Sequence, residues 1–473
     1  MEPTPRLVLL YLPCTVNVEF LAPYEDVTFT PRLEEFAAQS VVFERHMTES
    51  GQSGPSYASI FTGRHADGHG VFHHPTPIDS EIAIVGEVFR RAGFYVEAWL
   101  AHVMASGELG YGRGANEVHH LALTHGTPEF VHLLRRLRDE PRAKALVVAN
   151  HTLTHSPYRV ESLGPFCARH SEECSLRAED PQRFDAAAGF YLNHHAELSH
   201  DFPDVVARYE LSKEQIDYLA QVIEVLYRAN IARLDHHFGS LLDAIEAHGL
   251  TSVSLVAFTA DHGEAMYREE LLFPWTHGHQ LAHEVLQVPL LIRAPGVAPR
   301  RYRVVTRSTD LLPTLASLAG VKPPVLPSDP WNGVDLAAAM RNEAPEPALE
   351  AYSHTALTAR VVVEESASWG RFRSWFPRED PELMWAQLRS ARPVADASFD
   401  NSVVQLRGHL DEAGSVSIVP AFVGSPPLDR DAALERVREY RRRLIEVWRD
   451  GSDAEQLDEE YQKELLRRLG YIE

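Results

Sequence analysis

The stretch VSLVAFTADHGE, residues 253–264, indicates both how the chain folds and where its chemistry lies. Its first seven residues form a short, mostly apolar run, which is typical of a strand buried on both faces of a parallel sheet. Asp261 and His262 follow directly, and both side-chain types bind divalent cations. An Asp that caps a helix beside a surface His is the plainer explanation of such a pair. His277 and His279 follow in the next loop, and these further imidazoles favour a functional site.

Short apolar runs alternate with longer helical patterns along the chain. We expect strands at 7–12, 95–100, 145–149, 253–259 and 288–293, and helices at 30–41, 82–92, 130–137 and 213–248. This alternation predicts an α/β fold with a mostly parallel central sheet and helices on both faces. Ligands of such folds bind at the carboxyl ends of the strands, so the segments after residues 12, 149 and 259 are expected to carry the chemistry.

A proline-rich stretch at 322–335 predicts a domain boundary. Residues 1–335 are expected to form the main α/β domain, and residues 336–473 a smaller C-terminal α+β part. This smaller part is expected to contain strands at 360–363 and 415–419, followed by charged helices at 429–449 and 453–469.

The charge balance limits the partners of the protein. The 473 residues include 45 Lys and Arg against 67 Asp and Glu, which gives a formal charge of −22. Such a surface repels nucleic-acid phosphates and anionic membranes, so neither is expected as a partner. No apolar run reaches the roughly 18 residues of a membrane span, and the N-terminal run is too short for a signal peptide. We therefore expect a cytoplasmic protein, with homo-oligomers left open.

The chain has three cysteines, Cys14, Cys167 and Cys174. Their odd number and the lack of a CxxC motif argue against a disulfide framework or a structural zinc site. Cys167 and Cys174 could pair locally, but free thiols are the expectation.

Two further segments carry candidate chemistry. Ser53 begins the stretch SGPSYASIFTG, which fits a turn that opens a helix, where unpaired N–H groups favour an anion and a nucleophile. A Ser that only caps the helix is the alternative, and on local grounds the favoured one. His155 lies in the loop after the strand at 145–149, where it could donate to an oxyanion or act as a general acid, or simply be solvated. Residues 235–237, Asp-His-His on one helix, cannot all face one ion and are interpreted as structural.

Taken in order, these segments resemble the sulfatase family of the alkaline phosphatase superfamily. The resemblance rests on TPRL at 30–33, SGPS at 53–56, HSPY at 155–158, TADHGE at 259–264 and VPLLIRAPG at 288–296. It implies an alkaline phosphatase-like fold and hydrolysis or transfer at a sulfate or phosphate ester of a small molecule.

The resemblance also implies roles for single residues. Asp261 and His262 would bind a divalent cation, which is calcium in sulfatases and often manganese or zinc in phosphoesterase relatives. Ser53 would be the nucleophile, and His155 and His277 would take part in catalysis. His155, His277 and His279 would hold the transferred group.

The chain departs from the family pattern at three places, one of which is the missing Lys that commonly precedes the late His, absent around residues 275–279. No Asp follows the first strand, so Cys14, Asn17 or Glu19 would have to reach the Asp261 and His262 pocket. Tyr57 replaces the Arg of the formylglycine-conversion motif, so formylglycine is not expected. Two alternatives therefore stay open: a relative diverged to group transfer or other chemistry with an altered metal or none, and a non-catalytic relative whose pocket is filled by Tyr57.

Overall fold

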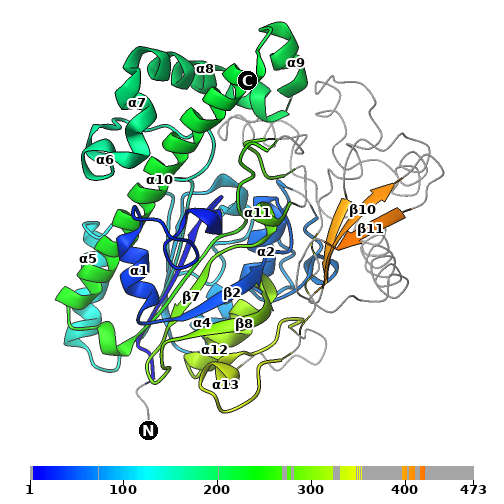
Figure 1. The fold of residues 1–473 in the computed structure, drawn as a ribbon. Helices are drawn as coiled ribbons and strands as arrows, with labels where there is room; N and C mark the ends of the chain where they lie inside the picture. The colour runs from blue at the N-terminus through cyan, green and yellow to red at the C-terminus, as the bar shows by residue number, and fades with distance from the viewer. Residues whose placement is uncertain are drawn as a thin grey trace.

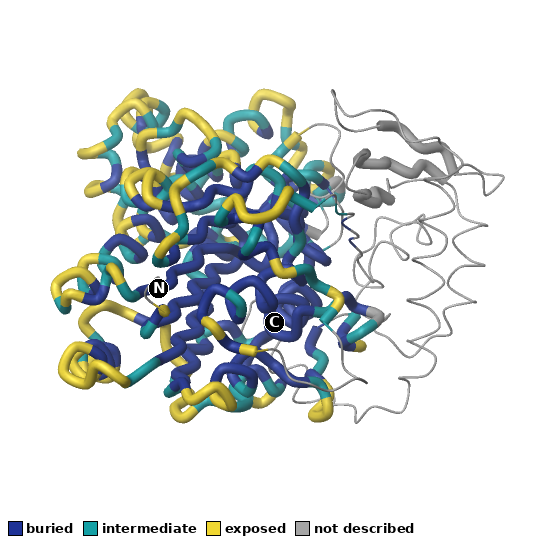
Figure 2. The backbone as a smooth tube through the Cα atoms, turned by 90° about the horizontal axis from the view of Figure 1, so that it is seen from below, coloured by how far each residue is buried: buried dark blue, intermediate teal, exposed yellow. Residues whose placement is uncertain are grey.

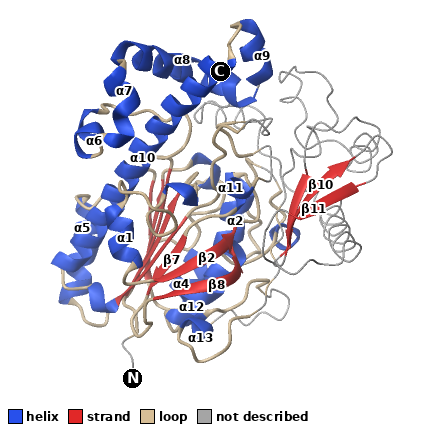
Figure 3. Ribbon diagram, viewed as in Figure 1, coloured by secondary structure: helices blue, strands red, loops and turns tan. Residues whose placement is uncertain are grey.

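The protein forms an eight-stranded sheet with helices on both faces (Figures 1 and 3). The computed structural model describes residues 4–72, 74–200, 202–268, 274–278, 282–322, 331–347, 349, 351 and 353, and the backbone of three strands after residue 396. The strand order is β4-β3-β5-β1-β6-β7-β2-β8. The strands are β1 Leu7–Pro13, β2 Val41–Met47, β3 Tyr95–Leu100, β4 Glu117–His119, β5 Ala145–His151, β6 Ser254–Thr259, β7 Leu290–Arg293 and β8 Arg300–Arg307.

The central strand β1 is buried along its whole length and pairs in parallel with β5 and β6. Successive side chains of a strand point to opposite faces of the sheet. Leu7 and Leu9 therefore pack into one apolar core, while Val8 and Leu10 pack into the other. Figure 2 shows this buried layer surrounded by exposed loops and helix faces. The predicted α/β class with helices on both faces is confirmed.

Helices of different lengths cover the two cores. The first core is covered by α1 Pro31–Ala37, α5 Pro128–Asp139 and α10 Lys213–Ala247, and the second by α2 Ser53–Thr62, α4 Val85–Arg91 and α12 Leu311–Leu318. Shorter or peripheral helices are α3 Ala66–His69, α6 Gly164–Arg169, α7 Ser175–Glu179, α8 Pro181–His200, α9 Phe202–Arg208, α11 His283–Leu286 and α13 Ala337–Met340. Asp235 on α10 accepts hydrogen bonds from the backbone N–H groups of Arg32 and Leu33, which supports the structural interpretation of the Asp-His-His run.

One strand, β7, runs antiparallel to both of its neighbours, β6 and β2. Because β7 is antiparallel to β6 and β2 is antiparallel to β7, β2 runs parallel to β6. The carboxyl ends of β2 and β6 therefore lie at the same edge of the sheet. The helix predicted at 30–41 ends earlier, at Ala37, because Val41 and Val42 pair with β7 and are buried as the start of β2. The strands β2, β4 and β8 were not predicted.

Cys167 and Cys174 form a disulfide, so the expectation of free thiols at these positions is wrong. Their Cα atoms lie 5.4 Å apart, within the bridging range. Disulfides persist mainly in oxidising compartments, so the cytoplasmic location remains a prediction that this bond does not support. Among the described residues, no helix combines the length and the apolar character needed to cross a bilayer.

After residue 396, β9 Ala397–Asn401, β10 Val404–Leu410 and β11 Val416–Pro420 form an antiparallel sheet. The strand predicted at 415–419 corresponds to β11. The predicted strand at 360–363 and the helices at 429–449 and 453–469 lie outside the described residues. The division at residue 335 stays a prediction, and Leu336 and Met340 pack in the second core of the main sheet.

Gly263 follows β6 and passes very close to another backbone segment. A Cβ atom added at this position would lie 1.9 Å from the carbonyl oxygen of Glu284. We expect Gly263→Ala to lower the free energy of unfolding by about 1–3 kcal/mol or more, because two backbones would have to separate. Gly189→Ala in α8 is the control, because its Cβ would meet no atom within 4 Å. Urea unfolding measures both, and equal stability of the two variants would contradict the expectation.

Glu97 on β3 predicts a pH dependence of stability. Burial raises the pKa of Glu97 from 4.5 to about 7, although the indole N–H of Trp99 donates to its carboxylate. The folded state keeps a proton that the unfolded chain loses, so stability falls as the pH rises from 4.5 to about 7, by at most about 1.4 kcal/mol per pH unit. Glu97→Gln should flatten this slope in urea unfolding, whereas Glu161→Gln at an exposed position should not.

Candidate active site

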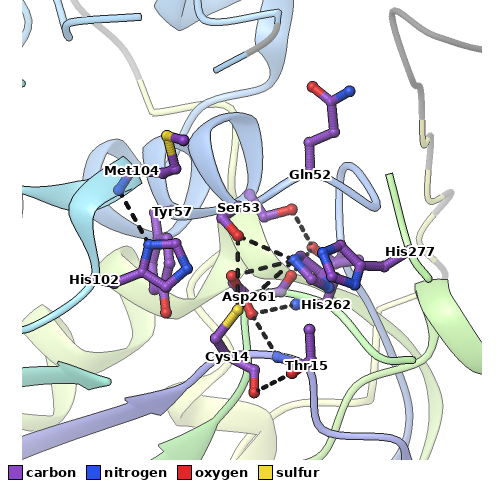
Figure 4. A network of polar contacts seen from close by, with 12 residues as sticks. Cys14, Thr15, Gln52, Ser53, Tyr57, His102, Met104, Asp261, His262 and His277 are labelled. Atoms are coloured by element: carbon purple, nitrogen blue, oxygen red, sulfur yellow. Dashed lines mark hydrogen bonds and ion pairs between the residues drawn. The ribbon is translucent and has the colours of Figure 1, made fainter. Parts of the chain in front are cut away.

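The carboxyl ends of four neighbouring strands, β3, β5, β1 and β6, meet at one edge of the sheet. Cys14 follows β1, His102 follows β3, and Asp261 follows β6. One potential ligand atom from each of these residues lies within 4.8 Å of the other two. Figure 4 shows these side chains pointing toward Ser53 and His262. All five are buried, with exposures of 1% or less.

The orientation of Asp261 is fixed by backbone donors. Its Oδ1 atom accepts hydrogen bonds from the N–H groups of Thr15 at 3.2 Å and His262 at 2.8 Å. Thr15 presents its N–H from a left-handed backbone conformation with φ of 56°. The Oδ2 atom is buried, has no hydrogen-bond partner among the described residues, and lies 3.4 Å from Nε2 of His262. A bare carboxylate oxygen therefore faces the centre of the cluster.

The protonation of His262 follows from its contact with the backbone. Its Nδ1 atom lies 2.9 Å from the carbonyl oxygen of Gly263, which can only accept, so Nδ1 carries a proton. In the neutral ring, Nε2 then carries a lone pair. This atom lies 3.1 Å from Oγ of Ser53. His262 thus offers an electron pair at the same point as Asp261.

Ser53 is the first residue of α2, and Gln52 rather than Ser53 occupies the N-cap position. The five residues between β2 and α2 are all buried. Within this connection, Thr48 donates a hydrogen bond from Oγ1 to the carbonyl oxygen of Asp261. The Ser53 hydroxyl is therefore not used as a helix cap and faces the cluster.

Cys14, directly after the first strand, is the residue of this segment whose side chain reaches the cluster. Its Sγ atom lies 3.7 Å from Oγ of Ser53 and 4.0 Å from Nε2 of His262. Burial, and then the negative charge of Asp261, raise the pKa of the thiol well above its ordinary value. Asn17 instead donates to the carbonyl oxygen of Glu264, and Glu19 forms an ion pair with Arg268.

His102 is the site residue that the sequence reasoning missed. The backbone N–H of Met104 donates to Nδ1 at 3.1 Å, so in the neutral ring the proton lies on Nε2. This Nε2 is buried and finds no hydrogen-bond partner in the part of the chain that the structure describes. Burial lowers the pKa of His102 well below its ordinary value, which keeps the ring neutral. The available signal was its place just after the predicted strand at 95–100.

His155 and His277 extend the cluster on one side. The His277 ring stacks on His262 with centroids 4.2 Å apart and lies 5.1 Å from the ring of His155. Nδ1 of His277 lies 3.1 Å from Oε1 of Glu264. The structure thus brings Ser53 and four of the predicted side chains together, while His279 lies outside the described residues.

Tyr57 does not occupy the space between Ser53 and Asp261. Its hydroxyl donates to the carbonyl oxygen of Leu12 at 3.2 Å, and its ring packs edge-on against His102 (Figure 4). Tyr57 therefore packs beside His102.

The donor set of this cluster fits a divalent cation. A carboxylate oxygen, an imidazole lone pair, a sulfur and a hydroxyl converge, and among the described residues Asp261 Oδ2 has no proton donor. A buried carboxylate oxygen without a hydrogen-bond donor is costly unless a cation lies beside it. Cys14, Ser53, Asp261 and His262 are the residues that could hold this ion, whereas His102 presents an N–H and not a lone pair.

Comparison with known proteins identifies the family. The family model described as Sulfatase matches residues 18–122 and 177–321, more than half of the chain. A choline-sulfatase from Rhizobium meliloti (strain 1021) is 24% identical over an alignment of 402 positions, and the match covers 73% of this chain and 73% of that protein. The chain belongs to the sulfatase family, as its motifs suggested.

Solved structures agree on the fold. A phosphonate monoester hydrolase from Silicibacter pomeroyi gives a TM-score of 0.56 at 18% identity and covers 93% of this chain and 95% of its own. A protein in complex with its substrate, D-glucosamine-2-N,6-O-disulfate, gives a TM-score of 0.57 at 14% identity, with coverages of 99% and 97%. Membership of the sulfatase family indicates an ester hydrolase, and these solved structures support its fold.

Proposed function

We propose that this protein is a metal-dependent hydrolase of a small-molecule sulfate or phosphate ester, with Ser53 as the nucleophile. The observation that carries the proposal is the position of Ser53 Oγ, 3.1 Å from the His262 lone pair and beside the unpartnered Oδ2 of Asp261. A divalent cation bound by Asp261 and His262 would neutralise ester charge and lower the pKa of the serine hydroxyl. The absence of nucleic-acid and membrane partners stays a prediction.

Ser53 attacks the sulfur or phosphorus atom and displaces the alcohol of the ester, and water then hydrolyses the serine ester. The hydroxyl lies at the N-terminus of α2, where the helix dipole and N–H groups favour an anionic group. His102 supports the same anion, because its buried Nε2–H needs an acceptor. A neutral donor of this kind holds a developing negative charge without reorganisation.

The departing alcohol needs a proton, and the pair formed by His277 and Glu264 can supply it. Burial raises the pKa of Glu264 to about 8, so the pair retains a proton at neutral pH. His155 differs, because it donates Nδ1–H to the carbonyl oxygen of Ser156 and burial lowers its pKa to about 4. Its neutral ring then carries an acceptor at Nε2, which can orient the attacking water by a hydrogen bond, whereas so low a pKa makes it a weak base.

One alternative function is favoured by a specific contact. The Ser53 hydroxyl can donate directly to His262, which would activate the serine without a metal. Asp261 cannot complete a serine–histidine–aspartate triad, because Nδ1 of His262 donates to Gly263 and not to Asp261. Activity that survives exhaustive chelation and still requires Ser53 would establish this metal-free serine chemistry.

The proposed nucleophile can be tested with p-nitrophenyl sulfate, p-nitrophenyl phosphate and bis-p-nitrophenyl phosphate. We expect Ser53→Ala and Asp261→Asn to lower kcat/KM by at least about 10³-fold on the preferred ester. Ser59→Ala is the matched control, since Ser59 is buried in the same helix and contacts His69 instead. Turnover of both site variants at the level of the Ser59→Ala protein would leave the non-catalytic relative as the better description.

The role of His102 predicts a separate effect. His102→Ala should lower kcat/KM by about 10²–10³-fold, because a donor to the developing charge is lost. It should also weaken inhibition by the product anion, sulfate or phosphate. Tyr57→Phe provides the control, since the Tyr57 ring packs on His102 while its hydroxyl contacts Leu12. Unchanged inhibition in His102→Ala would show that this residue does not hold the anion.

A further inference from the structure

Cys14 stands at the end of β1, where the family resemblance implies metal-binding carboxylates. Its backbone N–H donates to the carbonyl oxygen of His151 at 2.9 Å, which anchors the residue between β1 and β5. The sulfur is fully buried within the cluster and lies 4.0 Å from Nε2 of His262. The unpartnered Oδ2 of Asp261 faces the same space. A sulfur therefore replaces an oxygen in the donor set.

The two histidines beside Cys14 differ in what they offer to a cation. The carbonyl of Gly263 fixes a proton on Nδ1 of His262, which leaves the Nε2 lone pair for a metal. The N–H of Met104 fixes the opposite tautomer in His102. Although His102 lies within ligand distance of Cys14 and Asp261, its N–H would face the cation. His262 is therefore the nitrogen ligand, and His102 is left for the ester.

Four of the six distances among the candidate ligand atoms are close to those around a small tetrahedral ion. With Zn–S of about 2.3 Å and Zn–N or Zn–O of about 2.0–2.2 Å, tetrahedral ligand atoms lie about 3.4–3.6 Å apart. Measured from Nε2 of His262, the distances are 3.1 Å to Ser53 Oγ, 3.4 Å to Asp261 Oδ2 and 4.0 Å to Cys14 Sγ. The distance from the sulfur to Ser53 Oγ is 3.7 Å. Small side-chain shifts would complete the coordination.

Ligand chemistry separates the candidate metals. Calcium takes 6–8 ligands, all of them oxygen, whereas thiolate and imidazole ligands favour zinc and similar transition ions. Among the described residues, Asp261 and Ser53 supply the side-chain oxygens at this point. We propose that Cys14 is a metal ligand and makes this a zinc-type thiolate site that discriminates against calcium. This inference rests on the metal-dependent site of the proposed function and specifies its ion.

Cobalt substitution tests the thiolate bond independently of activity. Chelator-treated protein loaded with Co²⁺ should show the near-ultraviolet charge-transfer absorption of a cobalt thiolate, and Cys14→Ser and Cys14→Asp should lack it. The double variant Cys167→Ser/Cys174→Ser is the matched control, because it removes the sulfur atoms of the other two cysteines and should keep the band. Cobalt bound to the wild type without this band would overturn the proposal.

Competition between Zn²⁺ and Ca²⁺ in calorimetry tests the selectivity. The wild type should bind Zn²⁺ in preference to Ca²⁺, and Cys14→Ser should bind Zn²⁺ at least about 10-fold more weakly. Cys14→Asp restores a hard ligand, so its Ca²⁺ affinity should rise relative to Zn²⁺. Tighter binding of Ca²⁺ than Zn²⁺ by the wild type would overturn the inference.

The two proposals fail in distinguishable ways. Ser53-dependent turnover by calcium-loaded protein that shows no cobalt–thiolate band would sink the zinc-type site and leave the hydrolase intact. A cobalt–thiolate band that disappears in Cys14→Ser would uphold the site, even if Ser53→Ala turned over p-nitrophenyl esters like the wild type. Thermal unfolding of Cys14→Asp and Cys14→Ser establishes that both variants are folded before binding is compared.

Discussion

Two backbone N–H groups, those of Thr15 and His262, hold one oxygen of Asp261, and the geometry of the site depends on this contact. Both bonds go to Oδ1, so the other carboxylate oxygen, Oδ2, faces the cluster of candidate ligands. The bond from Thr15 also joins the loop after β1 to the loop after β6, where Cys14 lies 4.0 Å from His262. A charged side chain thus determines the relative position of two main-chain segments.

The direction of β7 explains how Ser53 arrives at the same place. Because β7 opposes both β6 and β2, the carboxyl end of β2 returns to the edge where β1 and β6 end. The connection to α2 then begins at this edge, and Thr48 binds the carbonyl of Asp261 on the way.

Much of this architecture was predictable from local patterns. Five strands are short apolar runs in the sequence: β1, β3, β5, β6 and β7. The end of the run that forms β6 is followed by Asp261 and His262, so the sequence predicted where these two residues lie. β2 escaped prediction because Val41 continues an apparent helix in sequence, and only pairing with β7 decides its conformation. His102 was missed because an isolated His after a strand is common in surface loops. The proton positions of His102 and His262 depend on the N–H of Met104 and the carbonyl of Gly263, and neither contact is visible in sequence.

The burial of α2 on every side has a consequence for how the protein could work. All ten residues of Ser53–Thr62 are buried, so the helix has no solvent-facing side on which to roll or fray. The position of Ser53 is therefore set when the chain folds, and this loss of conformational entropy is not repeated when a ligand binds. For the proposed nucleophile, adaptation to different esters would then come from the surroundings of the substrate.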